Sequence, residues 1–166
     1  MYPLILFVLA LVAAIIHLVV TPKAATASRT IEVLLSYIIP LNIGIGSLMA
    51  FAGHAFYGPD IAKIIGWVAG SPFQSQVSAA YLALGVAGLI SIWWRQGFWI
   101  ATSIISALFV FGTAYVHFLE MSEGHLGSSS SGVFLYTGDL LIPAVYLILA
   151  YFYGAGHNFF KPSKRR

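Results

Sequence analysis

The sequence contains no cysteine. This absence excludes disulfide bonds, thiolate metal sites, iron–sulfur clusters, cysteine nucleophiles and dithiol redox chemistry. It leaves the redox state of the compartment undetermined, because a chain without thiols fits an oxidising or a reducing one.

Charged residues are also scarce. They make up 8% of the 166 residues, whereas soluble domains carry about 25%. Hydrophobic residues make up 60%, and the mean hydropathy is +0.91, so the chain could not solvate the surface of an ordinary soluble domain. No basic stripe interleaved with aromatic residues is present, so we expect no nucleic-acid partner. The expected partners are the lipid bilayer, other membrane subunits or further copies of the chain.

Five apolar stretches approach or exceed the length that crosses a bilayer, about 20 helical residues. They cover residues 2–20, 31–56, 77–94, 98–118 and 133–153. The first could be a signal peptide, but it has no basic segment before it and exceeds the roughly 7–15 residues of a signal core. The sequence therefore predicts an all-α integral membrane bundle of five transmembrane helices. Residues 1–160 form one domain and residues 161–166 a basic cytoplasmic tail.

The stretch between the second and third spans is too short and too rich in glycine and proline to cross a membrane. It covers residues 58–76, and we interpret it as an interfacial or re-entrant segment with Trp67 at the level of the lipid headgroups. Within the second span, Pro40 lacks a backbone donor, so we expect a kink there.

The distribution of charge predicts the orientation of the bundle. With five spans and the N-terminus outside, seven of the eight Lys and Arg residues fall on the cytoplasmic side and only Lys63 falls outside. Basic residues are enriched in cytoplasmic loops. The acids follow the opposite pattern, since only Glu32 lies inside. We therefore expect a plasma or inner membrane protein with its N-terminus outside and its C-terminus in the cytoplasm.

This topology brings polar residues from several segments to a similar depth near the outer face. The candidates for a ligand or proton site are His54, Asp60, Gln74, Gln76, His117, Glu120 and Asp139. Asp139 lies roughly 9 Å inside its span at about 1.5 Å per residue. An unpaired acid within a membrane costs about 2.5–3.5 kcal/mol, so Asp139 needs a partner, water or a proton. By depth, its nearest partners are His54 and His117.

The fourth span carries a polar face. Residues at intervals of three and four along it are Thr102, Ser106, Phe109, Thr113, His117 and Glu120, and such residues share one side of a helix. Three interpretations remain open for the polar cluster: a histidine–aspartate pair that fastens two helices, a ligand or proton site, or a metal site. His54, His117 and Asp139 are the only candidate metal ligands, and no metal motif supports them. The sequence does not identify a cofactor or any catalytic residues.

A short set of motifs resembles a known family. Gly66-Trp67 and Ser71-Pro72-Phe73-Gln74 precede a third span rich in small residues. These residues, with Gly53 and Phe56 around His54, resemble the small multipass membrane proteins of the uncharacterised family DUF6790, mainly over residues 42–94. The family pattern has an acid where this chain has Gln76. The resemblance implies membrane location and carries no activity with it.

Three functions fit these features. The first is a non-catalytic membrane component or complex subunit with a polar site near the outer face, indicated by the short chain and the close-packing helix faces. The second is a transporter or channel for a proton or small solute. The third is a membrane enzyme that acts on a lipid or quinone-like substrate with histidine and carboxylate groups as acid and base. These groups could also hold a catalytic metal ion. We favour the first.

Overall fold

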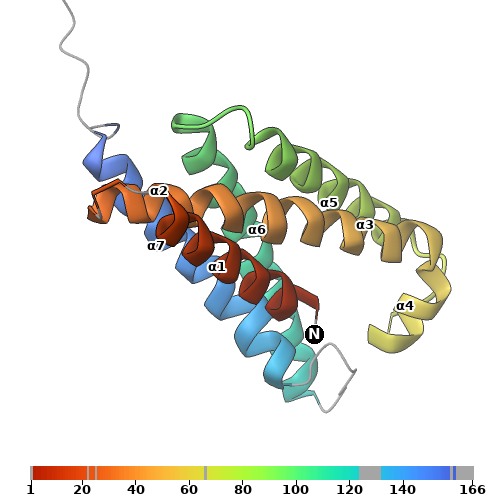
Figure 1. The fold of residues 1–166 in the computed structure, drawn as a ribbon. Coiled ribbons are helices and arrows are strands. Elements are labelled where there is room, and N and C mark those ends of the chain that lie inside the picture. The colour runs from red at the N-terminus through yellow and green to blue at the C-terminus, as the bar shows by residue number, and fades with distance from the viewer. Residues whose placement is uncertain are drawn as a thin grey trace, which may run out of the picture.

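A computed structural model describes residues 2–21, 23–24, 26–65, 67–123, 132–157 and 159. The described chain folds into an all-α bundle (Figure 1). The predicted basic tail, Gly66 and residues 124–131, which include four consecutive serines, lie outside the described residues.

Five helical segments in the described chain are long and apolar enough to cross a membrane. The first is α1 (Tyr2–Val20), and the second combines α2 (Ala27–Ile38), η1 (Ile39–Ile45) and α3 (Gly46–Phe56). A short helix, α4 (Gly58–Ile65), follows. The remaining spans are α5 (Pro72–Ile90), α6 (Gly97–Ser122), and η3 (Phe134–Leu141) with α7 (Ile142–Gly156). The predicted fold class is confirmed, with α4 as the non-spanning segment between the second and third spans.

Several of the predicted helix boundaries are wrong by four or five residues, since the second span begins at Ala27 and the third ends at Ile90. The third span begins at Pro72 rather than at residue 77, because the Ser71 hydroxyl accepts a hydrogen bond from the Phe73 amide and Pro72 occupies the first turn, where a proline loses no helical hydrogen bond. The fourth span continues to Ser122. Gln74 and Gln76 are consequently helical residues rather than linker residues, and Glu120, a member of the predicted polar face, lies within α6.

Two of the spans contain π-helical segments next to a proline. Pro40 is the second residue of η1, and Pro143 follows η3 as the second residue of α7. A proline cannot donate to the carbonyl four residues earlier, and a π-helix instead pairs residues five apart, as the Ile142 amide does with the Thr137 carbonyl. The expected disturbance at Pro40 therefore takes the form of a widened turn. Such π turns occur frequently at functional sites.

Glycines allow the second and third spans to pack backbone against backbone. A Cβ added to Gly88 would lie 2.3 Å from the Gly44 nitrogen and 2.6 Å from its Cα. On the other face of the second span, Gly46 and Asn42 are directed toward α1. Side chains buried between α1, α2, α6 and α7 complete the core, with Leu35, Trp99 and Tyr146 among them.

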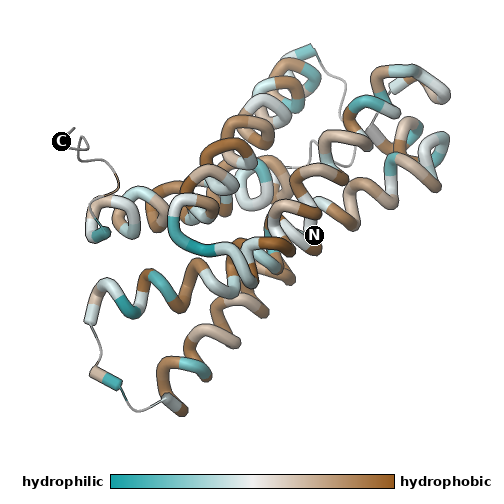
Figure 2. Tube along the Cα trace, turned by 90° about the horizontal axis from the view of Figure 1, so that it is seen from above, coloured by the Kyte–Doolittle hydropathy of each residue, from teal (hydrophilic) through white to brown (hydrophobic). Residues whose placement is uncertain are grey.

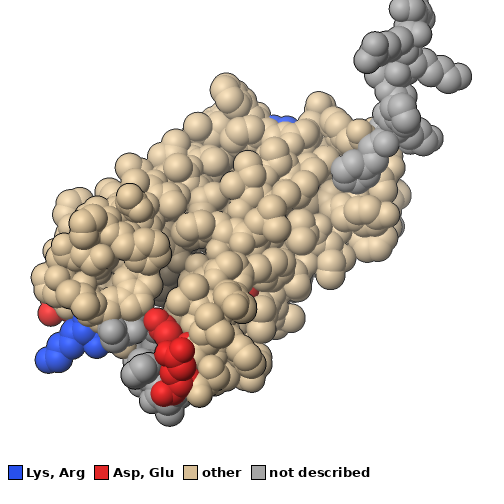
Figure 3. All heavy atoms as spheres, turned by 180° about the vertical axis from the view of Figure 1, so that it is seen from behind, with Lys and Arg blue, Asp and Glu red and all other residues tan. Residues whose placement is uncertain are grey.

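The outer surface of the bundle is mostly apolar. Large apolar side chains are exposed along α1, α5, α6 and α7, and the helices are predominantly hydrophobic along their middle portions (Figure 2). In Figure 3 most of the visible charged side chains lie near one end, and the rest of this face is nearly free of charge. This distribution suits a molecule whose middle faces lipid.

Candidate functional site

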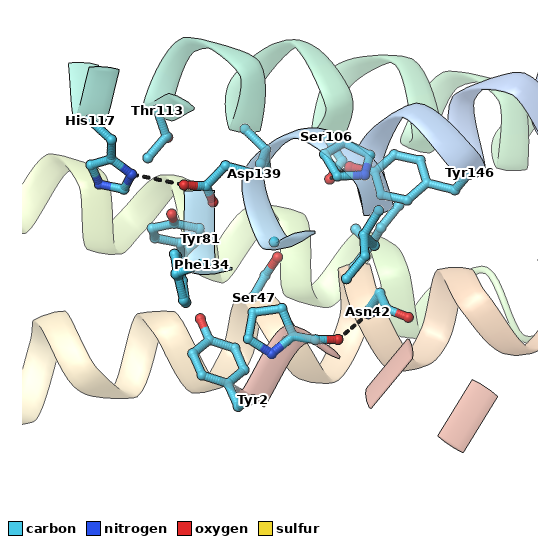
Figure 4. Close-up of a pocket in the computed structure, with 17 residues that line it drawn as sticks. Tyr2, Asn42, Ser47, Tyr81, Ser106, Thr113, His117, Phe134, Asp139 and Tyr146 are labelled. Carbon is cyan, nitrogen blue, oxygen red and sulfur yellow. Dashed lines mark hydrogen bonds and ion pairs between the residues drawn. The ribbon is translucent and has the colours of Figure 1, made fainter. Parts of the chain in front are cut away.

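A buried histidine–aspartate pair joins the fourth and fifth spans. His117 on α6 and Asp139 in η3 are 7% and 6% exposed, and the His117 Nδ1 atom lies 2.8 Å from the Asp139 Oδ2 atom (Figure 4). The contact is an ion pair when the imidazole is protonated and a charged hydrogen bond when it is neutral. Of the two histidines expected near Asp139, the structure places His117 against it.

The pair opens onto a cavity of about 80 Å³ inside the bundle. Its walls come from α1, the second span, α5, α6 and the fifth span. The polar residues in the lining are Tyr2, Asn42, Ser47, Tyr81, Ser106, Thr113, His117, Asp139 and Tyr146. One water molecule needs about 10–15 Å³ of such a cavity. The space therefore suits a few waters or one small polar molecule.

Part of the cavity lining has no internal hydrogen-bond partner. The Asn42 amide nitrogen donates to the Pro3 carbonyl at 3.0 Å, while its Oδ1 atom is buried without a partner. Ser106 and Tyr146 satisfy each other, with their oxygens 3.0 Å apart. Buried acceptors are expensive to leave unpaired. Among the described lining residues, Asn42 therefore carries a buried acceptor that no protein group satisfies.

Both π-helices contribute residues to the cavity lining. Asn42 and Ile43 come from η1, and Gly138 and Asp139 come from η3. Figure 4 shows Asn42 and Asp139 on different spans among the residues that line the cavity. The irregular backbone therefore lies where protein and cavity surround it, as a membrane interior requires.

Sequence reasoning found only part of this lining. Ser106, Thr113 and His117 belong to the predicted polar face of the fourth span. The tyrosines Tyr2, Tyr81 and Tyr146 were missed, because tyrosine in an apolar segment resembles any other core or interface aromatic residue. Only a structure shows which aromatic residues surround the same space.

A second group of predicted residues forms an aromatic cluster beside the cavity. The His54 ring stacks on Tyr81 and on Trp67, with centroid separations of 5.9 and 6.0 Å. The Trp67 indole nitrogen donates to Glu120 Oε1 at 3.1 Å. Because Tyr81 also lines the cavity, it connects this cluster with the His117–Asp139 site.

The other predicted residues lie apart from the cavity. Gln74 is buried and donates to the Gly58 carbonyl at 2.7 Å, which fastens the start of α4 to the start of α5. Asp60 and Gln76 are exposed, and neither lines the cavity. The described chain brings no three His, Asp or Glu side chains close enough to hold one metal ion.

This fold and site define a class: a small all-α membrane protein with five apolar spans around a buried polar cavity. The chain belongs to the family described as "Family of unknown function (DUF6790)", which matches residues 1–158. The match extends well beyond the predicted region of likeness, residues 42–94. Comparisons with curated proteins and with solved structures give no match.

Proposed function

We propose that this protein is a non-catalytic membrane component whose polar cavity binds a small solute that donates hydrogen bonds. His117 and Asp139 anchor the solute, and the tyrosines around the cavity complete its coordination. One observation carries the proposal: Asp139 and Asn42, whose Oδ1 atom has no hydrogen-bond partner, belong to the lining of the same small cavity.

The chemistry of the lining indicates the kind of solute. Asp139 offers a carboxylate and Asn42 offers an amide oxygen, and both groups accept hydrogen bonds. A small cation with several N–H donors satisfies both acceptors and balances the buried charge. A purely structural pair would need no cavity beside it.

Thermal unfolding of the full chain in lipid nanodiscs tests the proposal. Ammonium, methylammonium and guanidinium chloride are compared with sodium chloride at equal ionic strength. A solute that binds only the folded protein stabilises it by about 2.7 kcal/mol at 100 times its Kd. We expect at least one of the three to raise Tm for the wild type and for Asp60→Asn, and not for Asp139→Asn.

Asp60→Asn is the matched control, because Asp60 is an exposed acid that does not line the cavity. A wild-type Tm that is unchanged by all three solutes contradicts the proposal. Equal shifts in Asp139→Asn would also contradict it, since they would place the solute elsewhere.

Transport of a proton or small solute is the second candidate. It is favoured by the two proline-associated π segments, which belong to different spans and both contribute residues to the cavity lining. Transporters commonly bind their substrates where spanning helices are interrupted. In proteoliposomes, transport predicts a pH-driven dye response that Asp139→Asn abolishes and Asp60→Asn retains. Equal responses in empty liposomes would contradict it.

The surroundings of the protein belong to the same proposal. The apolar exterior fits a lipid bilayer as the main partner, with contacts to other membrane subunits or to a second copy of the chain through exposed helix faces. The charge distribution of the sequence favours the plasma or inner membrane, the N-terminus outside and the C-terminus in the cytoplasm.

A further inference from the structure

A second cavity lies at the opposite end of the bundle from α4. It has a volume of about 400 Å³ and is formed where α1 ends, α2 begins and α5 turns into α6. Its lining residues are His17, Thr21, Lys23, Arg29, Glu32, Val33, Ser36 and Arg95. None of these residues lines the cavity beside Asp139, so this is a separate site, which we call the basic pocket.

The basic pocket has an excess of positive charge. It contains Lys23, Arg29 and Arg95, which are three of the four lysine and arginine residues that the structure describes. Glu32 is the single acid in the lining, and its Oε1 atom lies 3.5 Å from the Arg95 guanidinium. That contact leaves the charges of Lys23 and Arg29 without a carboxylate among the described residues.

Arg29 is held in place by neutral groups. Its guanidinium donates to the Lys23 carbonyl at 2.7 Å, to the Thr21 carbonyl at 2.9 Å and to the Thr21 hydroxyl. These bonds fix the orientation of the side chain and leave its charge uncompensated. A positioned arginine binds an anion with less loss of side-chain entropy than a mobile one.

The surroundings of the basic pocket are those of a lipid interface. Val19 and Val20 at the end of α1 are 77% and 67% exposed, and Trp93 and Trp94 beside Arg95 are 74% and 63% exposed. Exposed tryptophans are typical of the headgroup region. An anion in the pocket would therefore have apolar surface next to it for acyl chains.

We propose that the basic pocket binds the phosphate headgroup of an anionic phospholipid. Lys23 and Arg29 bind the phosphate, and Glu32 weakens the site because it holds Arg95 and repels the anion. Basic pockets between spanning helices bind such headgroups through these interactions. The proposal is independent of any solute in the cavity beside Asp139.

Native mass spectrometry of the full chain tests this proposal. The protein is taken from mixed micelles with equal amounts of phosphatidylglycerol and phosphatidylcholine, and bound lipid is counted. We expect phosphatidylglycerol to be retained preferentially. Lys23→Gln should lower the affinity for phosphatidylglycerol about five-fold, the effect of one basic residue near anionic lipid. Glu32→Gln should raise this affinity. Lys63→Gln removes one positive charge from α4, outside the pocket, and should leave it unchanged.

Several results would overturn the proposal. Equal retention of the two lipids would show that the pocket does not select an anionic headgroup. An equal loss of phosphatidylglycerol affinity in Lys63→Gln and Lys23→Gln would show general electrostatic attraction rather than a site. Inorganic phosphate and glycerol phosphate are added in separate arms to distinguish a free anion from a lipid. Displacement of phosphatidylglycerol by either at low millimolar concentration would assign the pocket to a soluble phosphate instead.

Discussion

At the scale of single residues, the His117–Asp139 hydrogen bond joins two helices where little water is available. Both side chains are buried, and their 2.8 Å separation satisfies one atom of each. The need of Asp139 for a partner follows from sequence, because an acid inside a span is costly. The identity of the partner does not, because depth alone leaves His54 and His117 equivalent.

The free-energy costs of removing the two partners of this pair should not add. Asp139→Ala leaves a buried imidazole unpaired, so we expect a loss of about 3–5 kcal/mol in the free energy of unfolding. His117→Ala with Asp139→Ala should cost less than the sum of the single changes. Denaturant unfolding in mixed micelles measures these values. Asp60→Ala, at an exposed acid, should keep the free energy of unfolding within about 0.5 kcal/mol of the wild type. If Asp139→Ala had an equally small effect, the His117–Asp139 pair would not stabilise the fold.

The two glutamines at the start of α5 should differ in the same measurement. Gln74→Ala removes a buried side chain and its hydrogen bond to the Gly58 carbonyl, and we expect a loss of about 1 kcal/mol from the lost hydrogen bond. Gln76→Ala changes an exposed side chain and should have an effect within about 0.5 kcal/mol. If the two variants unfolded alike, Gln74 would not fasten α4 to α5.

At the scale of helices, the close contact of Gly44 with Gly88 sets the distance between the second and third spans. The third span is rich in small residues in the sequence, and two of them, Gly85 and Gly88, lie at the contact. The residue opposite Gly88 could not be predicted from period alone. An α-helical period does not apply through η1, where each turn contains more residues.

Gly88→Ala should separate these two spans. Its Cβ would lie 2.3 Å from the Gly44 backbone, and overpacking of this kind costs about 1–3 kcal/mol. Gly112→Ala is the matched control, because nothing lies within 4 Å of its added Cβ and alanine favours helix by up to about 1 kcal/mol. Thermal unfolding should therefore shift Tm downward for Gly88→Ala and not for Gly112→Ala. Equal Tm values would contradict the close contact.

At the scale of the whole molecule, composition and hydrophobic runs were sufficient to predict five spans and the all-α class. The predicted site residues reach the same end of the bundle, yet they divide there into a buried pair, an aromatic cluster and exposed side chains. The orientation of each helix about its own axis decides which of these side chains face the cavity. That orientation depends on packing between helices, which cannot be predicted from a single sequence. The cavity itself is a property of several spans together.

Because the chain has no cysteine, single cysteines can report its orientation. Ser28 and Ser75 are exposed near opposite ends of the bundle, and Ser28→Cys and Ser75→Cys are close in size to the native residues. We expect a membrane-impermeant maleimide to label position 75 in intact cells and position 28 only after permeabilisation. Labelling of both positions from one side would contradict the topology, and the reverse pattern would invert the orientation.

The most direct test of a binding cavity fills it without altering the pair. Ser47 lines the cavity and is 8% exposed, and Ser47→Leu places an apolar side chain in that space while His117 and Asp139 remain. The measurement is the affinity of the solute that raises Tm in the wild type, determined by calorimetry in nanodiscs. We predict that Ser47→Leu abolishes binding and that the variant still unfolds cooperatively. Unchanged affinity in Ser47→Leu would show that the solute does not occupy the cavity and would contradict the account.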